Sequence, residues 1–331
     1  MLILQLVLKT FKEIQHSIAP DLARLNDIIA RSLHSDSALM NSIVTRYLEV
    51  KGKQLRPMMV LLSARLFGGV NEAVLHAGAA VEMLHNASLI HDDVLDDSRV
   101  RRGVATINGL WDNHVAVLVG DFFVSTALSC AVTTGDATIV KVMAQLGADL
   151  SLGEINQIDN VRQHITTEAG YFDVISRKTA SLFTCCVEMG GIAAGATPAQ
   201  LQGIKQFAHL LGLCFQIKDD TFDYYHDPAV GKPTGNDLRE GKITLPLIHA
   251  LSLEDRPERA AMLELACRPQ LDAGEIETLV QWAKDCGGID YAFATMRRLR
   301  DEAMTHLAGY PAGDTVEMLA SIFDYIITRN K

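Results

Sequence analysis

Two aspartate-rich segments are the part of this 331-residue sequence in which residue types and spacing could do chemistry. Residues 92–97 read DDVLDD and residues 219–223 read DDTFD, so the DDxxD spacing occurs twice. Residues four apart lie on one face of a helix. The pairs so formed are Asp92 with Asp96, Asp93 with Asp97, and Asp219 with Asp223. Mg²⁺ typically binds one or two carboxylates together with substrate phosphate oxygens, so the repeat predicts a diphosphate held between the clusters by magnesium.

A solvated acidic surface is the competing interpretation of one aspartate run. Like charges four residues apart repel, and the C-terminal end of a helix is already the negative end of its dipole, so such a cluster is unfavourable without a bound cation. Each segment follows a long apolar stretch with helical spacing. The stretch before the first segment has Val74, Gly78, Val81, Leu84 and Ser88 on one face. Two buried helices that end in the same motif favour a site over a solvated face.

A diphosphate also requires cationic partners, and the sequence supplies a set of them. They are Lys53, Arg56, His85, Arg101, Arg102, Lys178, Lys232 and Lys242. Arginine offers a planar fork that matches phosphate, and lysine a mobile point charge. Taken singly, each cation is an ordinary surface residue, and His85 is equally compatible with a hydrogen-bonded core histidine. The second motif adds Gln216, one turn before Asp219 on the face that Asp219 shares with Asp223.

The elements that position these residues are predicted to be helices. Before Thr197 only Pro20 and Pro57 interrupt helical patterns, and no alternating strand pattern of useful length occurs. We expect helices over residues 74–97 and 201–225, the second stopped by Pro228. Residues 228–242, rich in Gly, Pro and charge, are predicted to form a surface loop, after which TLPLIHAL resumes helix.

Composition limits the classes of protein. A net charge of -10 argues against a nucleic-acid surface, and 48% hydrophobic with 21% charged residues excludes general disorder. The six cysteines contain no CxxC pair, which argues against a zinc site and indicates a cytoplasmic protein. The apolar start MLILQLVL ends at Lys9, far short of the about 20 residues of a spanning helix, so at most peripheral membrane contact is expected. We interpret the chain, residues 1–331, as a single all-helical domain rather than two.

The ordered motifs resemble those of the trans-type isoprenyl diphosphate synthases, especially the bacterial long-chain polyprenyl members. The matching segments are GKQLRP, HDDVLDDSRVRRG, the Gly120-Asp121 pair, SRKTA, FQIKDDTFDY and GKPTGNDLREGKITLPL, over roughly residues 51–251. The resemblance implies an all-α fold of long, mostly antiparallel helices around a central cavity, usually as a homodimer. It also implies Mg²⁺-dependent, head-to-tail condensation of isopentenyl diphosphate with an allylic diphosphate.

The resemblance implies a role for each candidate residue. Asp92, Asp96 and Asp219 would bind Mg²⁺, three ions per active site, with Asp93, Asp220 and Asp223 in support. Lys53, Arg56, His85 and Arg102 would hold isopentenyl diphosphate, and Arg101, Lys178, Lys232 and Lys242 the allylic diphosphate. Thr179 and Gln216 would face the developing allylic cation.

Small residues near the first motif bear on product length. Short-chain members of the family tend to carry aromatic residues at the positions of Ala87 and Ser88, and Ala131 lies on the next predicted apolar helix. We therefore expect a deep tunnel and a long product of about eight to eleven isoprene units (about C40–C55).

Alternatives within and beyond this chemistry are a medium- or short-chain synthase, a class I terpene cyclase, a catalytically silent partner subunit, and a module that only binds divalent ions. A cyclase has no use for the isopentenyl-site cations. A silent subunit should lack one aspartate motif. A divalent-ion module explains neither the cations nor the buried helices.

Overall fold

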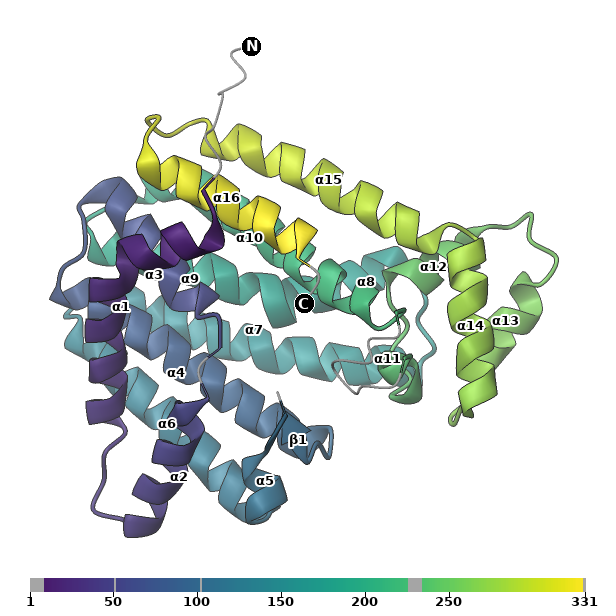
Figure 1. The fold of residues 1–331 in the computed structure, drawn as a ribbon, viewed down its shortest axis with the longest axis horizontal. Helices are drawn as coiled ribbons and strands as arrows, with labels where there is room; N and C mark the ends of the chain where they lie inside the picture. Colours follow the sequence, from purple (N-terminus) through teal and green to yellow (C-terminus); the bar gives the residue numbers. More distant parts are fainter. Residues whose placement is uncertain (1–8, 51, 102, 226–233, 330–331) are drawn as a thin grey trace. The chain divides into compact units, whose positions relative to one another are not determined.

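The computed structural model describes residues 9–50, 52–101, 103–225 and 234–329, which are helical apart from one short hairpin (Figure 1). The elements are α1 (Phe11–Ser32), α2 (Ala38–Glu49), α3 (Leu55–Phe67), α4 (Glu72–Leu95), β1 (Val100–Arg101), β2 (Val104–Ala105), α5 (Ile107–Leu110), α6 (Asn113–Thr133), α7 (Ala137–Arg162), α8 (Glu168–Ile175), the π-helical turn η1 (Ser176–Ala180), α9 (Ser181–Ala193), α10 (Pro198–Phe222), α11 (Asn236–Arg239), α12 (Leu245–Ser252), α13 (Arg259–Ala266), α14 (Ala273–Asp285), α15 (Gly288–Leu307) and α16 (Asp314–Thr328). The all-α prediction is confirmed.

The chain divides into two compact units. The first comprises residues 1–148, 182–205 and 307–321, and the second comprises residues 149–181, 206–306 and 322–331. Helices α7, α10 and α16 each contribute residues to both units. The first aspartate motif belongs to the first unit and the second motif to the second unit.

Helix α4 is the centre of the first unit. It begins where the Asn71 side chain accepts a hydrogen bond from the Val74 amide, and it packs most extensively against α6 (Figure 1). Val74, Val81 and Leu84 of the predicted apolar face are buried, whereas Ser88 at its end is half-buried. The helix is nevertheless buried on more than one face, so it is a core helix rather than an amphipathic surface helix.

The end of α4 differs from the sequence prediction. The helix stops at Leu95, and Asp97 takes a left-handed conformation with φ of 51°. The expected pairing of Asp93 and Asp97 on one helix face is therefore wrong, because Asp97 lies beyond the last helical turn. The hairpin of β1 and β2, too short to produce a readable alternation, follows directly.

Two other local predictions need correction. Helix α10 ends at Phe222 rather than Tyr225, and Pro20 lies inside α1 rather than interrupting it. Helix α1 continues through Pro20 because residues on both sides of it, Ile18 and Leu25, are buried in the core. Packing thus overrides the local cost of the proline.

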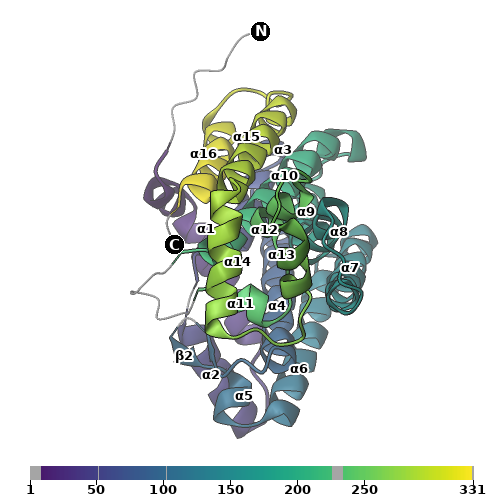
Figure 2. The same cartoon turned by 90° about the vertical axis from the view of Figure 1, so that its right-hand side faces the viewer.

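The second unit has its own apolar cluster around α12, α13 and α14 (Figure 2). Tyr224, immediately after the second aspartate motif, is 2% exposed and belongs to this cluster, as does Leu238 of α11. The end of the second aspartate motif and helix α11 are consequently anchored in one core.

One described helix, α6, is long and apolar enough to cross a membrane by length and composition alone, with a mean hydropathy of 2.0. A core helix of a soluble protein passes the same test, and 39% of its apolar window is buried here. The finding is therefore weak evidence for a membrane span.

We predict that Gly190→Ala destabilises the protein. A Cβ at Gly190 of α9 would overlap the backbone carbonyl of Val60 in α3, so the two helices would have to move apart. The expected loss is about 1–3 kcal/mol of unfolding free energy, measured by urea denaturation. Gly147→Ala is the matched control, because a Cβ in that helix meets nothing within 4 Å and should leave stability unchanged or raised. Equal effects of the two substitutions would contradict the close helix contact.

Candidate active site

The first aspartate motif presents two of its carboxylates outward. Asp96 is exposed and Asp92 is half-buried, whereas Asp93 is 5% exposed. Arg101 donates a hydrogen bond from Nε to Asp93 Oδ1 at 2.8 Å. Burial raises the pKa of Asp93, and the nearby Arg101 guanidinium partly offsets that shift. Asp93 is therefore a supporting residue, and Asp92 and Asp96 remain as candidate metal ligands.

The hairpin after α4 is fastened to the first motif by residues that sequence reasoning missed. Asn108, 1% exposed, donates its Nδ2 to the Asp93 carbonyl at 3.0 Å, and Arg99 donates to the Asn108 carbonyl at 2.8 Å. Asp97 pairs with Arg99 at 3.1 Å and is exposed. Asp97 thus belongs to a surface ion pair beside the motif.

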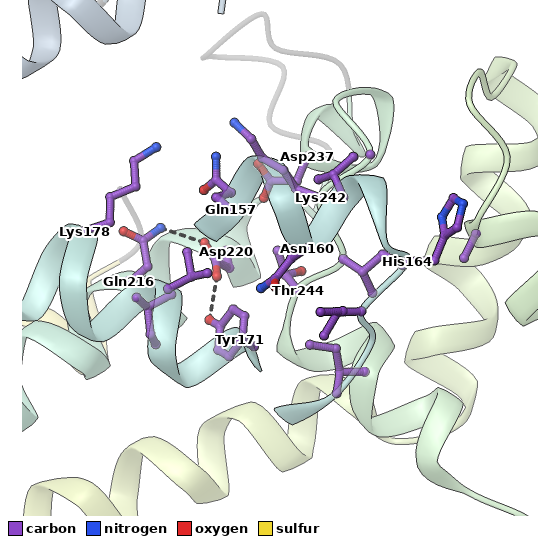
Figure 3. A pocket seen from close by; sticks show the side chains of 18 of the residues that line it. Gln157, Asn160, His164, Tyr171, Lys178, Gln216, Asp220, Asp237, Lys242 and Thr244 are labelled. Atoms are coloured by element: carbon purple, nitrogen blue, oxygen red, sulfur yellow. Dashed lines mark hydrogen bonds between the residues drawn. The ribbon is translucent and has the colours of Figure 1, made fainter. Parts of the chain in front are cut away.

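Asp220 of the second motif is held inside the protein. Tyr171 donates its hydroxyl to Asp220 Oδ2 at 2.5 Å, and Gln216 donates Nε2 to Oδ1 at 2.8 Å (Figure 3). Thr179 donates to Gln216 Oε1 at 2.7 Å, which continues the chain of hydrogen bonds. Burial raises the pKa of Asp220 to about 7, while the bonds from Tyr171 and Gln216 act in the opposite direction.

Asp223 has a different task. Its two carboxylate oxygens accept the backbone N–H groups of Asn236 and Asp237, each at 2.9 Å. These amides open α11, whose preceding residue Gly235 has a φ of 75°, a conformation that favours glycine. Asp223 therefore caps α11. The pKa of Asp237 at the start of α11 is raised, mainly by burial and also by the nearby carboxylates of Asp220 and Asp223.

Asp219 is the aspartate of the second motif with the most accessible carboxylate. Its side chain is 39% exposed, and it forms an ion pair with Arg329 near the C-terminus. Asp220 is 7% exposed and Asp223 is engaged by α11, so the three carboxylates of one DDxxD segment have three different surroundings.

The donor set fits magnesium brought by a substrate. Among the residues that the structure describes, no three His, Cys, Asp or Glu side chains are gathered into a metal-binding group. Mg²⁺ commonly uses only one or two protein carboxylates, with phosphate oxygens and water completing its shell. Asp92, Asp96 and Asp219 provide hard oxygen donors of this kind at accessible positions.

The SRKTA motif forms the π-helical turn η1, which interrupts the helical path between α8 and α9. A Cβ at Gly153 of α7 would lie 2.9 Å from the Lys178 amide nitrogen, so glycine permits the close approach of this turn. Lys178 pairs with Glu154, one residue further along α7. Such π-turns are frequent at functional sites, and this one delivers both Lys178 and Thr179.

A cavity of about 180 Å³ in the second unit brings several predicted residues together (Figure 3). Lys178, Thr179, Gln216, Asp220 and Lys242 line it. Lining residues that sequence reasoning missed are Gln157, Asn160, His164, Tyr171, Asp237 and Thr244, with apolar side chains such as Ile165, Val174, Ile175 and Ile248. Only Asp237 carried a signal, as an acidic residue within a recognised motif.

The other candidate residues occupy varied surroundings. Lys53 is exposed, the Arg56 guanidinium lies 5.4 Å from the centre of the Phe183 ring, and His85 is 7% exposed. Lys242 pairs with Glu240 at 2.6 Å. The chain-length candidates are Ala87 and Ala131, both fully buried, and Ser88, which donates to the His85 carbonyl at 2.8 Å. Arg102, Lys232 and the apolar start at residues 1–8 lie outside the described residues.

Comparison with known proteins identifies relatives over the whole chain. A family model described as polyprenyl synthetase matches residues 37–283. Octaprenyl diphosphate synthase of Escherichia coli is 34% identical over 97% of this chain and 99% of its own length. A decaprenyl diphosphate synthase structure from Rhodobacter capsulatus matches with a TM-score of 0.91 at 35% identity, covering 97% and 100% of the two chains. The structure of a polyprenyl synthase from Caulobacter crescentus, crystallised with calcium and isoprenyl diphosphate, matches with a TM-score of 0.90 at 31% identity. The match covers 97% of this chain and 98% of that one.

We predict that Tyr171→Phe destabilises the metal-free protein in a pH-dependent manner. The variant loses the hydroxyl that supports ionised Asp220, at a cost of about 1–3 kcal/mol for a buried carboxylate. Because the pKa of Asp220 is raised, the folded protein binds more protons than the unfolded chain from about pH 4 to 7, and this contribution to stability is lost as pH rises through that window. The variant should therefore lose more stability at pH 8 than at pH 5.

Chemical denaturation in EDTA at both pH values measures this difference. Tyr291→Phe is the matched control, since its hydroxyl bonds the half-buried Glu168 at 2.7 Å away from the aspartates. An equal loss at the two pH values for Tyr171→Phe would rule out the proposed support of ionised Asp220.

Proposed function

The chain belongs to the polyprenyl synthetase family and is a prenyltransferase, and from this premise we propose that it condenses isopentenyl diphosphate with an allylic diphosphate. Repeated head-to-tail addition gives an all-trans polyprenyl diphosphate and releases one diphosphate per cycle. The observation that carries the proposal is the pair of DDxxD motifs, each at the end of a buried helix and each with accessible carboxylates: Asp92 and Asp96 in the first, Asp219 in the second. The family match and the relatives confirm the resemblance that was inferred from the motifs.

Asp92, Asp96 and Asp219 are the proposed ligands of Mg²⁺, with three ions per active site. When bound, the ions neutralise the charge that develops on the departing diphosphate. Asp93, Asp220 and Asp223 support the ligands indirectly. Their support consists of the bonds to Arg101, to Tyr171 and Gln216, and to the α11 backbone.

The cations are proposed to divide between two diphosphates. Lys53, Arg56, His85 and Arg102 bind isopentenyl diphosphate, and Arg101, Lys178, Lys232 and Lys242 bind the allylic diphosphate. Each allylic-site cation that the structure describes has a carboxylate partner: Asp93, Glu154 and Glu240 for Arg101, Lys178 and Lys242 respectively. A diphosphate, which carries more negative charge, would compete with these carboxylates for the cations.

The reaction requires stabilisation of an allylic cation after diphosphate departs. Thr179 and Gln216 offer oxygen dipoles for this, and the bond between them at 2.7 Å fixes both orientations. The isopentenyl double bond attacks the cation, forming a carbon–carbon bond, and the resulting tertiary cation loses a proton to the released diphosphate. No covalent nucleophile on the protein is needed.

A long product, of about eight to eleven isoprene units, is proposed from the small residues of α4 and α6. Ala87 and Ala131 are fully buried in the packing of the first unit, where α4 and α6 form its most extensive contact. Alanine at both positions keeps the side-chain volume there small. A medium- or short-chain product is the competing outcome.

We further propose a homodimer in the cytoplasm with at most peripheral membrane contact. Helix α6 carries exposed apolar side chains along one side: Val117, Leu118, Leu128 and Val132, of which Leu118 is 64% and Val132 63% exposed. Exposed apolar surface of this extent is typical of an interface with another protein copy. A second copy packed on α6 would cover it.

The first experiment is a product assay with Mg²⁺, isopentenyl diphosphate and either geranyl or farnesyl diphosphate. We expect the wild-type protein to give polyprenyl products when both metal and primer are present. In Asp96→Asn, we expect kcat to fall by about 10²–10³-fold. Asp97→Asn is the matched control, because Asp97 is exposed, pairs with Arg99, and has a left-handed conformation that asparagine tolerates. It should retain near-normal activity. Absence of elongation by the wild-type protein with either primer would refute the synthase proposal.

We predict that Ala87→Tyr shortens the product. A phenol ring at a fully buried position on α4 would block the space below the first motif, so elongation should stop after fewer cycles. Chromatographic sizing of the products measures the change, and a retained first condensation shows that the variant is folded. An unchanged product distribution from an active Ala87→Tyr protein would show that the growing chain does not pass this residue.

A further inference from the structure

Arg329 is a buried cation that the proposed chemistry does not use. It follows the last residue of α16, and its side chain is only 8% exposed. Its guanidinium carbon lies 4.4 Å from the centre of the Phe215 ring and 5.6 Å from that of Phe222. A guanidinium removed from water to this degree requires an anion, and the structure supplies Asp219.

The position of Arg329 is set by a firm framework within the second unit. The end of α16 is joined to α10 through the edge-to-face contact of Phe323 with Phe207, whose ring centres are 5.6 Å apart. It is joined to α15 through Arg300, which binds Asp324 with two bonds of 2.8 and 3.2 Å. Arg329 also donates its backbone N–H to the Tyr325 carbonyl at 2.9 Å. The ion pair with Asp219 is thus delivered by fixed secondary structure and differs from a chance surface contact.

The charge balance of the second motif gives this pair a purpose. Asp219, Asp220 and Asp223 lie within five residues, and Asp237 is held beside them by Asp223. Without a metal, these carboxylates repel one another. Arg329 places a permanent positive charge beside Asp219, which is the one aspartate of the second motif that we assign to the metal.

We propose that Arg329 is the resident counter-cation of Asp219, which orients this carboxylate in the metal-free protein and keeps its affinity for free Mg²⁺ low. This inference rests on the proposed role of Asp219 as a metal ligand. A divalent ion on the same carboxylate would be repelled by the neighbouring guanidinium charge. A diphosphate offsets that repulsion, because its negative charge attracts both cations. Arg329 therefore makes Mg²⁺ binding depend on the diphosphate.

The test compares wild type with Arg329→Gln and Arg329→Lys, titrating full-length protein with Mg²⁺ alone and with Mg²⁺ plus inorganic diphosphate. Calorimetry gives the affinity and thermal denaturation gives the shift in Tm. We expect Arg329→Gln to bind Mg²⁺ alone about 3- to 10-fold more tightly than wild type, with a smaller gain on adding diphosphate. Its Tm should fall in EDTA and recover on adding Mg²⁺. Arg329→Lys, which keeps the charge, should remain close to wild type.

Arg300→Gln is the matched control, since it removes an arginine–aspartate pair from the same helix junction without touching the motif. Arg300→Gln should lower Tm by the same amount with and without Mg²⁺. If Arg329 served only in packing, Arg329→Gln would behave in the same way. Unchanged or weaker Mg²⁺ affinity in Arg329→Gln would overturn this inference while leaving the proposed metal site intact. A wild-type protein that fails to respond to Mg²⁺ even with diphosphate would overturn both.

Discussion

Carboxylates gathered at the C-terminal end of a helix repel one another and the negative end of the helix dipole, and the surroundings of both DDxxD motifs depend on how that repulsion is offset. In the first motif, Arg101 neutralises the buried Asp93. In the second, Tyr171 and Gln216 donate to Asp220, backbone amides of α11 donate to Asp223, and Arg329 pairs with Asp219. The carboxylates are thus distinguished by their partners, although the sequence repeats them as equals.

This division explains several features that otherwise look unrelated. The π-turn of SRKTA brings Thr179 within 2.7 Å of Gln216, and Gln216 in turn holds Asp220. The short helix α11 begins where Asp223 accepts its first amides, so its start is held by the same motif that ends α10. The proposed metal-binding motif consequently also organises the backbone around it. Substitution of Asp220 or Asp223 would change the fold locally as well as the charge.

The helices beneath the motifs serve a different physical requirement. Helix α4 is buried on several sides and packs on α6 through residues as small as Gly120, against which the His91 ring lies. In a helix packed this closely, side-chain volume would be the variable that sets the length of the proposed product tunnel. The helical framework itself is shared with relatives at 31% and 35% sequence identity, with TM-scores of 0.90 and 0.91.

Much of the fold and of the site could be predicted from the sequence. Apolar spacing predicted the buried face of α4 from Val74 to Leu84, and the motifs predicted Lys178, Thr179, Gln216 and Asp220, which line one cavity. The errors were local: Asp97 left the helix because it takes a left-handed conformation, and Pro20 stayed in α1 because its neighbours are buried. Neither outcome is visible in residue type.

The sequence by itself determined which helices are buried, at which helix ends the carboxylates lie and which chemistry they suit. It could do so because periodicity and residue type act over a few neighbouring positions. Only the tertiary structure decided which carboxylate is sealed and which is accessible. Tyr171 is separated from Asp220 by 49 residues, and Arg329 from Asp219 by 110. Such partners come together only when helices distant in the sequence pack, and local sequence patterns do not show which residues will meet.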